Sequence, residues 1–116
     1  TIPVTVKDGQ VVNDQFQFPV SQFSASRFKE ALVDGDYVLG IRPEDLLVTE
    51  AEGLFTTELT NVELIGRERI LNFQLGLDRM KSIVSIEEEL EEGTSVSFDL
   101  NYSKAFIFKK TGERIY

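Results

Sequence analysis

The segment 69–77 has the clearest period-two alternation of the chain, and this alternation constrains the fold more than any other feature. Apolar side chains occupy every second position, at Leu71, Phe73, Leu75 and Leu77. The side chains of a β-strand point alternately to its two faces, so a period of two predicts a half-buried strand. We therefore expect these four residues to face a core, with the residues between them on the opposite face.

Other short strand patterns follow one another along the chain at intervals of about ten residues. They lie at 2–6, 11–12, 16–20, 36–42, 46–48, 55–65, 81–86, 94–100 and 105–108. Asp8-Gly9 between the first two is typical of a β-hairpin, and Gly66 followed by Arg67-Glu68 predicts a second hairpin. Pro19 favours an edge position for its strand. Many short strands separated by turns predict an all-β antiparallel barrel or sandwich.

One segment departs from this pattern. Phe28, Ala31 and Leu32 recur at the spacing of a helix, a serine at 24 or 26 can cap its start, and Asp34-Gly35 can end it. We therefore expect one short helix within residues 24–36.

Composition excludes several classes of function. With 20 acidic and 12 basic residues the net charge is −8, which disfavours non-specific binding to nucleic acid or to an anionic membrane. The chain has no His and no Cys, so the usual zinc sites and the Ser-His or Cys-His nucleophile pairs are not available to it. No glycine-rich phosphate-binding loop is present. We expect this chain to be no enzyme and to hold no cofactor or metal of its own.

The segment Glu87–Glu92 contains five acidic residues in six positions. Like charges at this density repel one another and favour contact with water. We therefore favour a solvated loop over a metal site or a site for a cationic partner.

The stretch 38–46 indicates an apolar strand that is forced to stop. Gly40 permits a bulge or a close approach of another backbone, and Pro43 cannot donate a ladder hydrogen bond. Pro43 also restricts Arg42 to extended conformations, and Glu44 follows where a helical turn would begin. We interpret Arg42 and Glu44 as parts of an ordered motif that joins strands, rather than as ligand contacts.

Three motifs in this order resemble the C-terminal regulatory domain of carbohydrate ABC-importer ATPases, the family that includes the ATP-binding subunits of maltose and glycerol-3-phosphate importers. The first is Gly-Ile-Arg-Pro-Glu at 40–44, the second runs from 62 to 68 before an apolar strand, and the third runs from 98–99 through 106–108 to 111–114. The resemblance covers residues 38–116, and the first 37 residues match only in their strand-rich pattern. The motif residues are Gly40, Arg42, Pro43, Glu44, Gly66, Glu68, Phe98, Asp99 and Gly112.

The sequence departs from the family pattern at four of these places, one of which is Ile65, where the family has Leu. Phe106 stands where the family usually has His, Lys109 where an acid is usual, and Arg67 where a small polar residue is common. The changes at Phe106 and Lys109 remove any polar role of that His but leave the strand intact.

The resemblance implies a fold of transport-associated oligosaccharide/oligonucleotide-binding (OB) barrels, also called TOBE or MOP-like, as two small interleaved halves. It implies that residues 1–116 are a single regulatory domain of a longer chain, whose ATPase domain precedes Thr1. ATP and Mg²⁺ would then bind in that ATPase domain and not here.

The resemblance also implies partners and a location. A second copy of the domain would pair with it within the ATPase dimer, the permease would be contacted through the ATPase domain, and regulatory proteins could dock on it. The domain would be cytoplasmic and peripheral, on the inner face of the cell membrane, and it would not insert into the membrane. It would have no nucleic-acid partner. Two alternatives remain open: a domain that binds small oxyanions, which needs a local basic cluster, and an OB-type nucleic-acid-binding module, which needs a basic groove with exposed aromatics.

Overall fold

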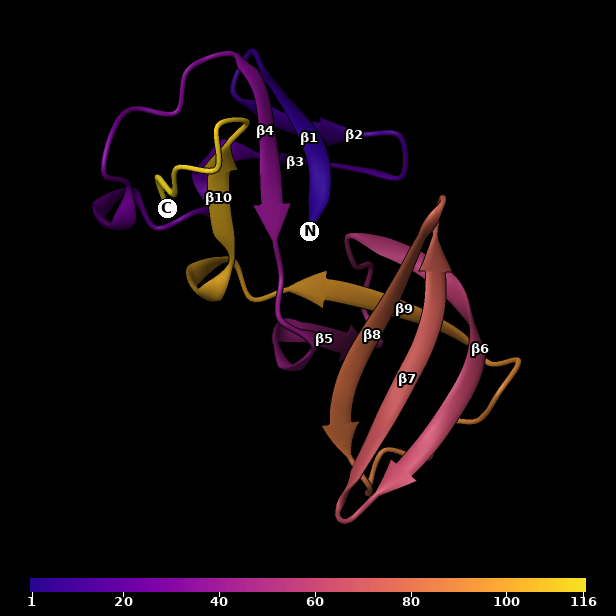
Figure 1. The fold of residues 1–116 in the computed structure, drawn as a ribbon. Helices are drawn as coiled ribbons and strands as arrows, with labels where there is room; N and C mark the ends of the chain where they lie inside the picture. The colour runs from indigo at the N-terminus through magenta and orange to yellow at the C-terminus, as the bar shows by residue number, and fades with distance from the viewer. The chain divides into compact units, whose positions relative to one another are not determined.

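The computed structural model describes residues 1–116, which form ten β-strands joined by turns and four three-residue 3-10 turns (Figure 1). The predicted all-β class is confirmed. The chain divides into two compact units, and we refer to them as unit 1 (1–41 with 101–116) and unit 2 (42–100). Unit 2 is continuous in sequence and is inserted between the two segments of unit 1.

Unit 1 is a five-stranded antiparallel sheet with the strand order β10-β4-β1-β2-β3. Its strands are β1 (Ile2–Lys7), β2 (Gln10–Asn13), β3 (Phe16–Pro19), β4 (Gly35–Gly40) and β10 (Phe106–Lys109). It also holds three of the 3-10 turns, η1 (Val20–Gln22), η2 (Ala25–Arg27) and η4 (Tyr102–Lys104).

The first hairpin forms as predicted. Lys7 pairs with Gln10, so that Asp8 and Gly9 make a two-residue turn with φ values of 50° and 76°. Positive φ at both central positions is the geometry that matches the twist of the flanking strands, and Asp-Gly adopts it readily. Pro19 ends β3, which is an edge strand as expected.

An aromatic cluster fills one side of unit 1, and it joins segments far apart in the sequence. The Tyr116 ring lies 4.8 Å from Phe23 and 4.5 Å from Phe28, between ring centroids, and the Arg27 guanidinium lies 4.3 Å above it. The buried Tyr116 hydroxyl donates to the carbonyl of Tyr102 at 2.8 Å and accepts from the backbone N–H of Ser24 at 2.9 Å.

The helix expected within residues 24–36 is wrong. Only η2 forms there, and Phe28 already has extended backbone angles, with φ −70° and ψ 129°. The backbone N–H of Lys29 donates to the carbonyl of Ile115 at 2.8 Å, which removes it from any helical ladder. Packing of Phe28 against Tyr116 explains why tertiary contacts override the helical spacing at this place.

Unit 2 contains β5 (Leu46–Thr49), β6 (Phe55–Ile65), β7 (Glu68–Leu75), β8 (Asp78–Ser85) and β9 (Ser95–Leu100), preceded by the 3-10 turn η3 (Pro43–Asp45). The strands pair in the order β5-β9-β6-β7-β8, all antiparallel. Figure 1 shows β6, β7 and β8 as a meander of long strands, with β9 and β5 crossing them.

The two outer strands of unit 2 are joined by a side chain. Ser82 on β8 is fully buried, and its hydroxyl donates to the carbonyl of Leu46 on β5 at 2.9 Å. This bond brings the ends of the strand order together, so that the sheet closes on itself like a barrel. Five strands in a partly open barrel are compatible with the predicted OB-type architecture.

The core of unit 2 is built from the alternating positions. Leu71, Phe73 and Leu75 are buried as predicted, and the Phe73 ring stacks on Phe98 with centroids 4.6 Å apart. Leu77 was expected on the same face, and this is wrong: 99% of it is exposed. Leu75 pairs with Asp78, so Gly76 and Leu77 form a two-residue turn outside the strand.

Candidate functional site

The first motif marks the place where one strand ends and the next unit begins. A Cβ added to Gly40 would lie 3.3 Å from the Cβ of Phe106, which is its partner across the β4–β10 ladder. Pro43 opens η3, where the backbone N–H of Asp45 donates to the carbonyl of Arg42 at 2.9 Å. The side chains of Arg42 and Glu44 are both exposed. The geometry of the motif is thus set largely by its backbone.

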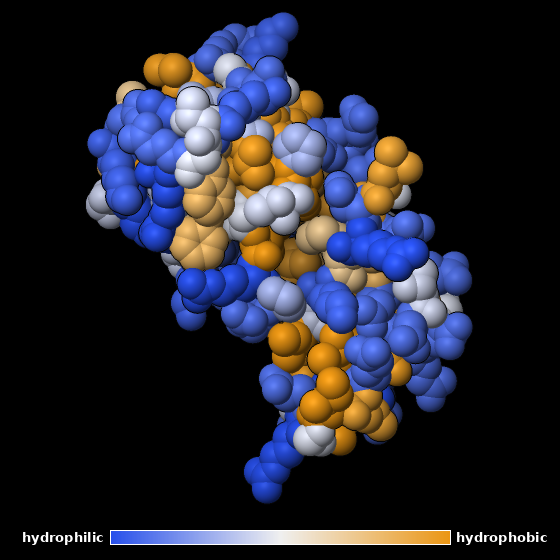
Figure 2. Space-filling view, viewed as in Figure 1, coloured by the Kyte–Doolittle hydropathy of each residue, from blue (hydrophilic) through white to orange (hydrophobic).

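The second motif forms the β6–β7 turn. Ile65 pairs with Glu68, and Gly66 has a φ of 61°, which a glycine adopts without strain. Glu68 is exposed and also pairs with Ser85 of β8. Hydrophobic side chains gather near this turn, where Leu64 is 61% and Ile65 57% exposed (Figure 2).

The third motif lies partly in each unit. Phe98 is fully buried in the core of unit 2, and the Asp99 carboxylate accepts a hydrogen bond from the backbone N–H of Leu100 at 2.8 Å. In unit 1, Gly112 has a φ of 94° and its N–H donates to the carbonyl of Lys109 at 2.8 Å. The Asp99 contact lies at the end of β9, and the Gly112 contact closes the turn after β10.

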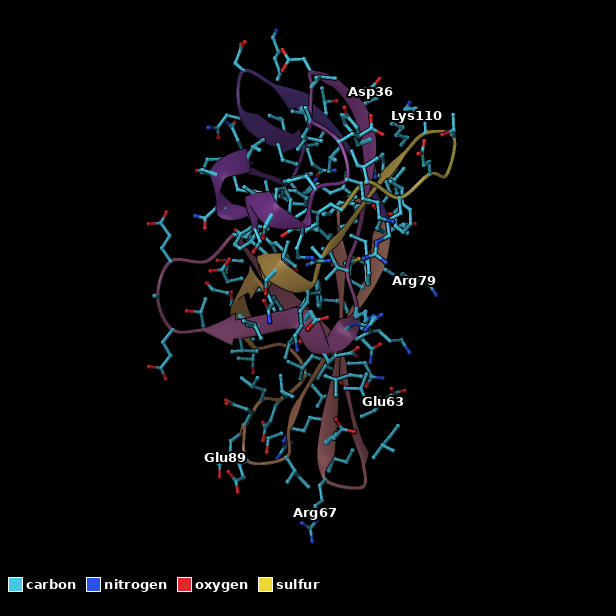
Figure 3. The ribbon with its side chains drawn as sticks, turned by 90° about the vertical axis from the view of Figure 1, so that its left-hand side faces the viewer. Asp36, Glu63, Arg67, Arg79, Glu89 and Lys110 are labelled. Atoms are coloured by element: carbon cyan, nitrogen blue, oxygen red, sulfur yellow. The ribbon has the colours of Figure 1, made fainter.

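Lys109, which stands where the family usually has an acid, forms an ion pair. Its Nζ lies 2.7 Å from Glu30 and 3.6 Å from Glu113. The hydrogen bond to Glu30 raises the pKa of Lys109 above its ordinary value, against a smaller effect of desolvation. A third ion pair, at 3.8 Å, joins Lys110 to Asp36 of β4 (Figure 3).

The motif residues therefore lie at the ends of strands, in turns and in a core. The motif residues that belong to unit 2 do not line a common pocket. Sequence reasoning missed two other groups of side chains. One is the Tyr116 cluster of unit 1, which only tertiary contacts assemble. The other is a polar hollow in unit 2, described below, whose residues come from three adjacent strands.

The acidic segment Glu87–Glu92 is exposed wherever it carries an acid. No group of three or more His, Cys, Asp and Glu residues is arranged to hold a metal ion. No helix is long and apolar enough to cross a membrane. Unit 2 has 14 acidic and five basic residues, a net charge of −9, whereas unit 1 has six acidic and seven basic residues, a net charge of +1.

Comparison with known proteins supplies one similarity. No family model matches the chain. The chain is 30% identical, over 113 residues, to the multiple sugar-binding transport ATP-binding protein MsmK of Streptococcus mutans. The match covers 90% of this chain but 30% of that relative, so the chain spans less than a third of the relative's length. The chain is thus distantly similar to part of an ATP-binding protein of sugar transport.

Proposed function

We propose that this chain is the C-terminal regulatory and dimerisation domain of the ATP-binding subunit of an ABC-type sugar importer. The observation that carries the proposal is the similarity to MsmK, which extends over 90% of this chain. The matched part of MsmK is a fraction of a larger ATP-binding protein, and the chain itself has no phosphate-binding loop.

The architecture supports the same proposal. The three motifs follow one another in the order of the importer ATPases that they resemble, and unit 2 closes like a barrel, which is compatible with an OB-type fold. In this proposal residues 1–116 act as one regulatory domain, with units 1 and 2 as its OB-like halves. It pairs with a second copy in the ATPase dimer, reaches the permease through the ATPase domain, receives regulatory proteins, and works on the cytoplasmic side of the membrane.

A replacement experiment tests the role directly. The segment of MsmK that matches this chain is exchanged for residues 1–116, and uptake of sugars is measured in Streptococcus mutans cells that lack native MsmK. We expect the chimera to restore uptake, and a matched MsmK without the segment to restore less. A chimera that assembles and hydrolyses ATP, but supports no more uptake than the truncated protein, would contradict the proposed role.

A second experiment concerns nucleotide. Without a phosphate-binding loop the chain should neither bind MgATP at about millimolar concentration nor hydrolyse it. Titration calorimetry measures this, and a saturable ATP site would show that nucleotide chemistry resides in this chain.

A further inference from the structure

Unit 2 contains a polar hollow of about 480 Å³ on the β6–β7–β8 meander. Its polar lining comes from all three strands: Thr60, Asn61, Asn72, Gln74, Arg79 and Lys81. Phe73 and Met80 also border the hollow, although the Phe73 side chain itself points into the core of unit 2. Pockets of about 300–1,000 Å³ are the size that small-molecule ligands occupy in proteins.

The strand register explains how these side chains meet. Asn72 pairs with Asn61 on one side and with Lys81 on the other, so the three residues form one row across the sheet. Gln74 pairs with Arg79 in the next row. Side chains that are paired across strands lie about 5 Å apart at Cβ and can act on one ligand together.

A β-bulge shapes one side of the hollow. The β6–β7 register shifts between Leu59 and Asn61, which leaves Thr60 as an extra residue in β6. The Thr60 hydroxyl donates to the carbonyl of Asn72 at 3.0 Å and fixes the bulge against β7. Bulges bend the strand that carries them and redirect side chains, often beside functional sites.

The charge of the hollow opposes that of its surroundings. Its lining holds two cations and no acid, although unit 2 as a whole has a net charge of −9. The ion pairs of residues 1–116 do not include Arg79 or Lys81, and both side chains are exposed. Figure 3 shows Arg79 directed away from the sheet. Two unneutralised cations two residues apart on one strand are suited to a ligand with a compact anionic group.

An amide in the hollow has hydrogen-bonding capacity left over. The Nδ2 of Asn72 is buried and has no hydrogen-bond partner. Buried amide groups are normally satisfied, and an unpaired one costs free energy that a ligand oxygen would recover. Side-chain amides both donate and accept, as do sugar hydroxyls, and the hollow presents three amides in Asn61, Asn72 and Gln74.

We propose that this hollow binds a phosphorylated monosaccharide. Arg79 and Lys81 hold the phosphate, and the three amides bind the hydroxyls of the sugar. The inference uses only residues of unit 2 and does not depend on the proposed role in transport.

Calorimetric titration with glucose 6-phosphate at low ionic strength tests the proposal. We expect saturable binding, weakened about tenfold or more by Arg79→Ala and by Lys81→Ala, since each removes one charge-assisted contact. Asn72→Asp should weaken it too, because it replaces a donor with a negative charge at nearly constant shape. Arg67→Ala is the matched control, an exposed cation of the same unit outside the hollow, and should leave binding unchanged.

Two further ligands separate the parts of the proposal. Glucose and inorganic phosphate should each bind more weakly than glucose 6-phosphate, because each lacks half of the recognised groups. Absence of saturable binding, or equal affinity in the Arg67, Arg79 and Lys81 variants, would overturn the site. Inorganic phosphate or glucose binding as tightly as glucose 6-phosphate would overturn the assignment of the ligand. Circular dichroism of each variant confirms that it is folded before titration.

Discussion

Gly53→Ala should destabilise unit 2, because the backbone of β9 passes directly over Gly53. An added Cβ would lie 2.5 Å from the carbonyl oxygen of Phe98 and 3.0 Å from the Cγ2 of Thr49. That carbonyl accepts a hydrogen bond from the N–H of Leu54 at 2.7 Å, and Phe98 is fully buried. The segment at 53–54 must therefore move away from β9, and the hydrogen bond must lengthen or break.

The magnitude follows from these contacts. Overpacking of this kind costs about 1–3 kcal/mol, and a weakened buried hydrogen bond adds about 1 kcal/mol. Restriction of the unfolded chain by the added methyl group offsets about 0.5 kcal/mol, so the net loss of stability is about 1.5–3.5 kcal/mol. For a chain of this size we expect the melting temperature to fall by about 6–16 °C.

Gly93→Ala provides the comparison for this substitution. A Cβ at Gly93 would meet nothing within 4 Å, so only its φ of 85° opposes the change, at about 1–2 kcal/mol. Thermal unfolding followed by circular dichroism measures both variants. If Gly53→Ala unfolds at the same temperature as the unmodified chain, or above Gly93→Ala, the close approach of β9 is not what fixes this position.

Three other predictions concern unit 1 and association. Tyr116→Phe removes two hydrogen bonds to part-buried backbone groups and should lower the urea midpoint by an amount equivalent to about 1–3 kcal/mol. The loss should exceed that of Tyr37→Phe, which removes one bond, and equal midpoints would contradict this. Lys109→Met should lower the melting temperature in low salt, and the difference from the unmodified chain should shrink in high salt, which screens the ion pairs. That difference should stay constant from about pH 6 to 8, because a lysine whose pKa is raised in the folded state loses its stabilising effect only in alkali. The free chain should be a monomer or a dimer with a Kd above about 10 µM, because tethering in an importer would supply the effective concentration that pairing needs. Sedimentation velocity measures this Kd, and added salt should strengthen the dimer by screening the charge of −8 on each copy. A nanomolar dimer would refute the tethering argument.

The strands were predictable because alternation and turn residues agree locally. Residues 55–65 matched β6 as observed, and Asp8-Gly9 gave the first hairpin. The extended backbone at Phe28 was not predictable, because the helical spacing around it is overridden by contact with Tyr116, 88 positions later in the sequence. Contacts of this range leave no local signal in the residues at either end.

The polar hollow was missed for a related reason. Asn72 and Gln74 were assigned to the outer face of their strand, but nothing local shows which residues stand opposite to them. The register follows from the two-residue turn at Gly76-Leu77, which places Lys81 beside Asn72. The sequence prediction extended the strand that begins at residue 69 through Leu77 and therefore did not recognise this turn. A strand that ended at Leu75 would have started the next one before Arg79-Met80-Lys81 and paired its two cations with Gln74 and Asn72.

The insertion of unit 2 into unit 1 has a consequence for the order of folding. Residues 42–100 contain all five strands of their barrel, so this unit can fold as soon as it leaves the ribosome. The sheet of unit 1 instead waits for β10, whose Ile107 pairs with Leu39 across 67 intervening residues. A folded barrel between them shortens that effective loop, and so lowers the entropy lost when β4 and β10 meet. Destabilising the barrel should therefore slow the completion of unit 1, although no strand of unit 1 has been altered.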